Sequence, residues 1–223
     1  QFMNHVAHDG PVRADLHLAH ARVLLEVGER EGARATLRAA LELMPGHLGA
    51  LRELSQLAEA SQDWVDLESC LTRLLRVEEE DGQKLALLRR LAALYDGPLA
   101  NPSRAEAAYR RILEQVDGDD AVLARLTAVY VALDDAEMAV ETHRERVVHA
   151  TSPDIRRLRL IELARLLDEV ANDPAAALKA LEEARANDPA DLQALTALAS
   201  FHGRHGNPAA MAGPLDAAVV DLQ

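Results

Sequence analysis

Three pairs of histidines, each separated by two residues, have the spacing in this 223-residue sequence that most resembles a metal site. The pairs are His5/His8, His17/His20 and His202/His205. On a helix this spacing places both imidazoles on one face, where they could share a metal ion. No carboxylate or third histidine is placed to complete a site, so we expect no bound metal. For His17 and His20 we favour contact with a segment that precedes them in a longer protein.

Other residues that carry chemistry are few. Cys70 is the single cysteine, which excludes an intrachain disulfide and a cysteine-rich zinc site. The sequence has no glycine-rich phosphate loop, no nucleophile elbow, and no serine or cysteine flanked by recognisable catalytic partners. We therefore expect a protein that is not an enzyme and needs no cofactor.

The charge of the chain limits its partners. The formal net charge is −13, which repels phosphate backbones and anionic lipids and argues against nucleic acid or a membrane as a partner. No apolar run approaches the roughly 20 residues that span a bilayer, and the start has no signal-peptide core, so we expect a cytoplasmic location. Lysine occurs only at Lys84 and Lys179, and heavy use of Ala, Leu and Arg is typical of a bacterial protein.

The composition and the spacing of apolar residues predict helices. Apolar residues make up 49% of the chain and aromatic residues only 3%, which favours helices packed through small side chains. One skeleton of small or apolar residues with helical spacing recurs four times: Ala33, Leu37 and Ala40; Leu67, Leu71 and Leu74; Ala105, Tyr109 and Ile112; Ala177, Leu181 and Ala184. Nothing alternates with a period of two, so we predict no strands.

Local signals mark the helix ends. Gly28 is expected to cap the C-terminus of the first helix in the left-handed conformation. Asp63 is expected to be the N-cap of the helix that begins at Trp64. The pairs Ser152-Pro153, Asp173-Pro174 and Asn207-Pro208 each combine a capping residue with proline at the first helical position. The first helix is predicted from about Arg13, after a leader, linker or tag remnant over residues 1–12.

These helices fall into units with a common register. The fourth residue of each first helix is taken as an anchor, and the anchors lie 34 to 37 residues apart: His17, Leu51, Leu88, Leu123, Leu160 and Leu195. A helix–turn–helix period near 34 residues resembles the tetratricopeptide repeat. Matching places include a first-helix leucine (Leu54, Leu91, Leu126, Leu163, Leu198), a small residue (Ala21, Ser55, Ala92, Ala164, Ala199) and a closing proline (Pro45, Pro189).

The resemblance implies an all-α fold, an α-solenoid of about six helix–turn–helix repeats wound as a right-handed superhelix. The expected solenoid covers residues 13–223, with units at about 14–47, 48–81, 82–119, 120–152, 153–191 and 192–223. A unit of this kind cannot bury its apolar face alone, so each depends on its neighbours.

The resemblance also implies a concave groove lined by the first helix of each unit. Groove-facing places hold Arg22, Arg52, Gln56, Glu59, Arg89, Arg165, Gln193 and Ser200. Four arginines facing inward on an acidic protein favour an acidic segment as the ligand, because guanidinium groups bind carboxylates bidentately. The alternative is that these arginines are ordinary solvated residues in i,i+4 pairs.

Three functions follow from this pattern. The first is a non-enzymatic interaction module that binds a peptide or protein segment in its groove, as part of a larger bacterial protein. The second is a structural spacer or oligomerisation element that stacks on flanking repeats. The third, RNA binding, is disfavoured by the charge. In one branch of the tetratricopeptide-repeat family, Lys and Asn at the fifth and ninth places of the first helix bind the C-terminal carboxylate of chaperone tails. The same places in the first repeat of this sequence hold Leu18 and Arg22, so we do not predict chaperone-tail binding. The partner and the oligomeric state are left open.

Overall fold

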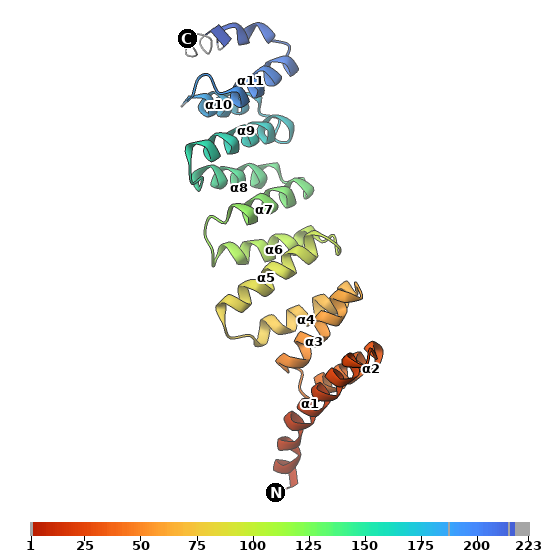
Figure 1. Cartoon of the computed structure of the whole chain (residues 1–223). Helices are drawn as coiled ribbons and strands as arrows, with labels where there is room; N and C mark the ends of the chain where they lie inside the picture. The colour runs from red at the N-terminus through yellow and green to blue at the C-terminus, as the bar shows by residue number, and fades with distance from the viewer. Residues whose placement is uncertain (1, 187, 214, 217–223) are drawn as a thin grey trace. The chain divides into compact units, whose positions relative to one another are not determined.

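The computed structural model describes residues 2–186, 188–213 and 215–216 of the chain. In these residues helices alternate with short turns and loops (Figure 1). The helices are α1 (Phe2–Glu26), α2 (Arg30–Leu43), α3 (Leu48–Ala60), α4 (Trp64–Val77), α5 (Asp81–Asp96), α6 (Pro102–Leu113), α7 (Asp120–Ala132), α8 (Ala136–Val148), α9 (Pro153–Glu169), α10 (Pro174–Arg185), α11 (Leu192–Arg204) and the 3₁₀ helix η1 (Pro208–Met211). No strand occurs in these residues, as the sequence predicts.

The chain divides into two compact halves, Gln1–Ile112 and Leu113–Gln223, which are described separately. They are called unit 1 and unit 2, and each contains several of the helix–turn–helix repeats. In unit 1, α1 packs on α2 and α3 packs on α4, while α2 contacts α3 and α4 contacts α5. The hydroxyl of Tyr109 in α6 donates a 2.8 Å hydrogen bond to Asp96 at the end of α5. The helices of this unit therefore pack on their neighbours in the chain, as stacked hairpins do.

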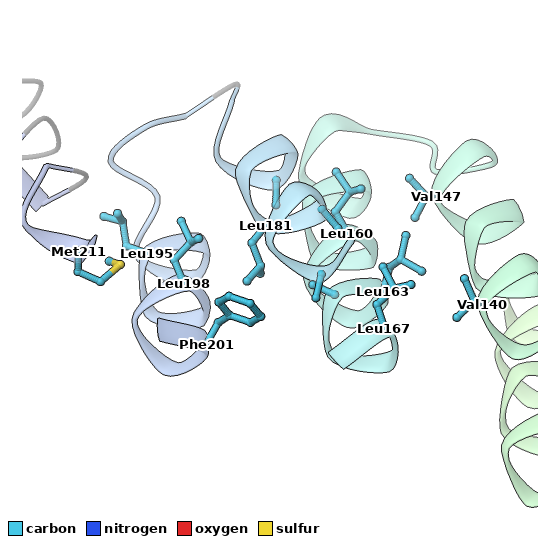
Figure 2. Close-up of a cluster of buried hydrophobic side chains, with 14 residues drawn as sticks. Val140, Val147, Leu160, Leu163, Leu167, Leu181, Leu195, Leu198, Phe201 and Met211 are labelled. Carbon is cyan, nitrogen blue, oxygen red and sulfur yellow. The ribbon is translucent and has the colours of Figure 1, made fainter. Parts of the chain in front are cut away.

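Unit 2 repeats this arrangement. Helix α7 packs on α8 and α9 packs on α10, with further contacts between α8 and α9 and between α10 and α11. Figure 2 shows the apolar side chains that α8, α9, α10, α11 and η1 contribute to one continuous cluster. A continuous core that no single hairpin could form is the physical reason for stacking the hairpins.

The recurring skeleton forms the buried face of the second helices, which confirms that prediction. Leu37, Leu71 and Ile112 are completely buried, and the other members of the skeleton are at most 6% exposed. Gly28 has φ +84°, the left-handed conformation expected of a helix cap. The side chains of Asp63, Ser152 and Asp173 accept hydrogen bonds from backbone N–H groups three residues on, as expected of N-caps.

Three local expectations differ from the structure. The first helix, expected from about Arg13, begins at Phe2 and includes Pro11. The side chain of Asn207 makes no capping bond, because the residues after it form a 3₁₀ turn rather than the first turn of an α-helix. Of the small residues expected at close helix crossings, Ala21, Ala92 and Ala164 are buried, whereas Ala199 is exposed. The helix predicted over residues 208–222, which was expected to cover Ala199, lies partly outside the described residues.

Candidate functional site

The eight residues expected to face a groove are all exposed, and they come from the first helices of their units. Helices α1, α3 and α5 of unit 1 carry Arg22, Arg52, Gln56, Glu59 and Arg89. Helices α9 and α11 of unit 2 carry Arg165, Gln193 and Ser200. These placements agree with the helix register assumed for the first helices.

In unit 1 the candidate residues form ion pairs that link one first helix to its surroundings. Arg22 Nε lies 2.9 Å from Glu53 on the next first helix, α3. Arg52 Nη2 lies 2.8 Å from the carboxylate of Glu78, just after α4. Burial opposes ionisation of Glu78, but hydrogen bonds from Arg52 and from two backbone N–H groups outweigh it and lower the pKa of this carboxyl. The arginines thus already hold carboxylates of the chain itself.

In unit 2 two of the candidate residues meet at one hollow. The hollow has a volume of about 380 Å³ and is lined by Arg165 and Glu169 of α9 and by Ser200, Phe201 and Arg204 of α11, among others. Arg165 Nε is 2.9 Å from Glu169 one turn further on, and Ser200 donates to the carbonyl oxygen of Thr196. Gln193 lies outside this lining. We call this the first-helix hollow.

A buried carboxylate holds the rim of the first-helix hollow. The side chain of Asp168 in α9 is 8% exposed and accepts hydrogen bonds from Arg204 Nη2 and His205 Nε2, both at 2.7 Å. Burial opposes ionisation of Asp168, but these hydrogen bonds and positive charges outweigh it and lower its pKa. Arg204 is therefore fixed in place, and His205, which also contacts the ring of Phe201, has a structural partner.

The histidine pairs do not assemble into a metal centre in the residues whose positions are described. His17 and His20 lie on one face of α1, where they line a shallow hollow of about 280 Å³ with Arg13 and Leu16. The side chains of His5 and His8 lie outside the described part of the chain. Cys70 is buried, and burial first and the charge of Asp66 second raise the pKa of its thiol to about 11. The thiol is thus protonated and inert at neutral pH.

A network of ion pairs around a buried arginine of unit 2 was not expected from the sequence. Arg146 of α8, 8% exposed, binds Asp120 of α7 through Nε (2.9 Å) and Nη2 (3.3 Å), and its Nη1 is 3.2 Å from Glu162 of α9. Arg159 of α9 binds the same two carboxylates at 2.6 and 3.0 Å. These residues, together with His143, are called the ionic cluster.

His143 lies inside the ionic cluster as a neutral imidazole. Its Nε2–H donates to the carbonyl oxygen of Arg159 at 3.2 Å, and its Nδ1 accepts from Arg146 at 3.4 Å. Burial first, and the charge of Arg146 second, lower the pKa of His143 below 6.5. Burial opposes ionisation of Asp120, but the hydrogen bond and charge of Arg146, reinforced by Arg159, lower its pKa. One bidentate guanidinium and one neutral ring therefore connect α7, α8 and α9.

A signal for this cluster does exist in the sequence. The repeated skeleton has a fifth copy in α8, where the places of Ala33, Leu37 and Ala40 hold Ala139, His143 and Arg146. Two titratable side chains at positions that are apolar in the other units must be either exposed or paired. Reading the mismatch as a buried polar pair would have found the cluster, although not its partners.

No helix in the described residues is both long enough and apolar enough to cross a membrane. No protein-family model and no curated protein matches the sequence. Solved structures do match in fold. YrrB, described as a TPR protein with an unusual peptide-binding site, is 19% identical over 81% of this chain and 89% of its own, with a TM-score of 0.50.

Two further structures agree with this match. MamA is 13% identical over 74% of this chain and 92% of its own, with a TM-score of 0.52. The C-terminal part of a TPR repeat-containing protein from Cytophaga hutchinsonii is 15% identical over 83% of this chain and 73% of its own, with a TM-score of 0.53. At such identities the matches establish the fold alone. Together with the repeat register and the stacked hairpins, they show that this chain has the tetratricopeptide-repeat fold.

Proposed function

We propose that this chain is a non-enzymatic interaction module that holds a segment of another protein along the exposed faces of its first helices. The observation that supports this is the first-helix hollow of about 380 Å³, where polar side chains surround the buried ring of Phe201. A hollow with an apolar floor and few polar groups suits one or two side chains of a peptide. The description of YrrB as having a peptide-binding site is consistent with this use of the fold.

The electrostatics of the first helices favour an acidic segment. Arg22, Arg52 and Arg165 have more than half of their side chains exposed, although each pairs with a carboxylate of the chain. An exposed pair of this kind contributes only about 0–1 kcal/mol, so a carboxylate of the partner can replace the internal one at little cost. The helices are already ordered, so little conformational entropy is lost by the receptor.

The experiment is selection of binding peptides from a random display library, followed by titration of the selected peptides against variants of the full chain. Arg52→Glu with Arg89→Glu tests unit 1, and Arg165→Glu tests unit 2. We expect at least one of these to weaken binding about tenfold or more, because each reversal replaces an attraction by a repulsion. Arg76→Glu, the same change at an exposed arginine of a second helix, is the control for a single charge reversal. Selected peptides that bind all variants equally would refute the groove.

A second function, stacking on flanking repeats or on another copy, is supported by α1. Leu16 and Val23 occupy the third and tenth places of their first helix and are 65% and 56% exposed. In α5 the same places hold Leu87 and Leu94, which are at most 8% exposed and lie on a helix that packs against α4. Helix α1 therefore has the apolar face that is typical of an internal repeat, rather than the polar face of a terminal, capping repeat.

Sedimentation velocity distinguishes this second function from a simple receptor. If α1 is an interface between copies, the chain sediments as a dimer, and Leu16→Glu with Val23→Glu converts it to a monomer. Glu26→Gln, an exposed change on the same helix, should leave the association unchanged. A wild-type chain that is monomeric at high concentration would contradict self-association and leave the peptide-binding proposal standing.

A further inference from the structure

The second helices of unit 2 enclose a different hollow from the one described above. Helices α8 and α10 both pack on α9. A space of about 470 Å³ lies between α8 and α10, above α9. Its floor is apolar and includes Val147 of α8 and Leu160, Leu163 and Leu167 of α9. Figure 2 shows Val147 on one side and the three leucines on the other. None of its lining residues belongs to the first-helix hollow, which uses another face of α9.

The rim of this second-helix hollow is positively charged, although the chain as a whole is strongly acidic. Arg144, Arg156 and Lys179 stand around it with a single carboxylate, Glu183. Arg156 Nη2 binds Glu183 at 2.7 Å, so that pair is internally neutralised. Within the described residues, Arg144 and Lys179 are exposed and have no ion-pair partner. Two uncompensated cations above an apolar floor match a carboxylate that adjoins an aliphatic side chain.

The hollow continues into a neighbouring one of opposite charge. This second space, about 410 Å³, shares Arg144 and Leu167 with the first and has Glu137, Glu141 and Asp173 on its rim. The acidic space lies between α8 and the turn that precedes α10, and the basic space lies between α8 and α10 itself. The groove along α8 is thus acidic in one part, basic in the other, and apolar along its floor. A simple aliphatic carboxylate would satisfy only the basic part. A peptide with a basic and an acidic residue on either side of aliphatic side chains satisfies both.

We propose that the groove between α8 and α10 is a second peptide-binding site, specific for a short segment in which aliphatic side chains lie between a basic and an acidic residue. The aliphatic side chains fill the floor, the acidic residue pairs with Arg144 and Lys179, and the basic residue pairs with Glu137 and Glu141. This site is on the second helices and is independent of the function proposed for the first helices.

The test is a chemical-shift titration of the isotope-labelled full chain with the blocked peptide KLALE. The single-charge peptides KLALQ and QLALE, and octanoate, serve as comparison ligands. We expect KLALE to bind tightest, each single-charge peptide to bind about threefold more weakly or worse, and the shifted amides to lie in α8 and α10. Octanoate binding as well as KLALE and displacing it would overturn the proposal, as would no binding of KLALE.

Variants of the chain test whether the peptide binds at the proposed place. Lys179→Glu should weaken KLALE about tenfold and should bind the peptide KLALK better than the wild-type chain does. Ala176→Phe, which fills the hollow from α10, should abolish binding of both peptides. Arg165→Glu in the first-helix hollow is the matched control and should leave KLALE binding unchanged. Loss of KLALE binding in Arg165→Glu but not in Lys179→Glu would overturn the proposal while supporting the first-helix site.

Discussion

The ionic cluster offers the sharpest test of how unit 2 is held together. Two perturbations remove the same ion pairs from opposite sides. Arg146→Leu removes the guanidinium, whose side chain is 8% exposed. Asp120→Asn with Glu162→Gln removes the two carboxylates, which are nearly half exposed. If desolvation of the remaining charge is the main cost, the two changes lower the free energy of unfolding by unequal amounts.

The magnitude follows from what each change leaves behind. Removing one side of a buried ion pair costs about 3–5 kcal/mol when the remaining charge is buried and unpaired. The carboxylate double variant strands Arg146 in this way, so we expect a loss of about 4 kcal/mol in the free energy of unfolding. Arg146→Leu strands only carboxylates that reach water and still contact Arg159, so we expect about 1 kcal/mol.

The assay is urea unfolding followed by two probes. Trp64, the only tryptophan in the sequence, lies in α4 of unit 1, so its fluorescence reports on unit 1. Far-ultraviolet circular dichroism reports on helices of both units. Repeat arrays need not unfold in one step, so we expect the carboxylate variant to lower the circular-dichroism midpoint more than the fluorescence midpoint.

One result would refute this reasoning. If Arg146→Leu destabilises the chain as much as the carboxylate double variant does, the stranded charge is not the main cost. The cluster would then contribute through the packing of the arginine stem and its hydrogen bonds. Arg111→Leu, at an exposed arginine of α6, is the control for the loss of one positive charge.

Three further predictions concern single residues. The pKa of His143 is lowered in the folded state, so the unfolded chain binds more protons below pH 6.5, and stability should fall as the pH drops below that value. In urea unfolding at several pH values His143→Gln should remove this dependence, and an identical slope in the variant would contradict it. Ala92 is completely buried at a helix crossing, so Ala92→Phe should cost about 1–3 kcal/mol by overpacking and lower the melting temperature, whereas Ala93→Phe at the exposed neighbouring position should not. The buried Cys70 thiol, with its pKa raised to about 11, should not react with a disulfide reagent near pH 8 until the chain is unfolded in urea. Rapid labelling of the native chain would show that α4 opens locally.

Much of the fold could be predicted because its signals are local. The register of Leu37, Leu71 and Ile112 identified the buried faces of the second helices, since a period of three to four residues selects one face of any helix. Capping residues such as Asp63 and Ser152 marked helix starts, since the side chain bonds an N–H only three residues away. The candidate site was predicted less completely. Arg165 and Ser200 meet at one hollow, whereas the charges of the groove between α8 and α10 come from helices whose spacing no local pattern specifies.

Local sequence patterns were enough to identify helical hairpins and the buried faces of the second helices α2, α4, α6 and α10. Which charges are neutralised depends on contacts between residues far apart in the chain. Arg146 binds Asp120, 26 residues before it, and Glu162, 16 residues after it. The physical reason is that an ion pair is selected by distance and burial in three dimensions, whereas helix periodicity and capping are selected within a few residues of chain.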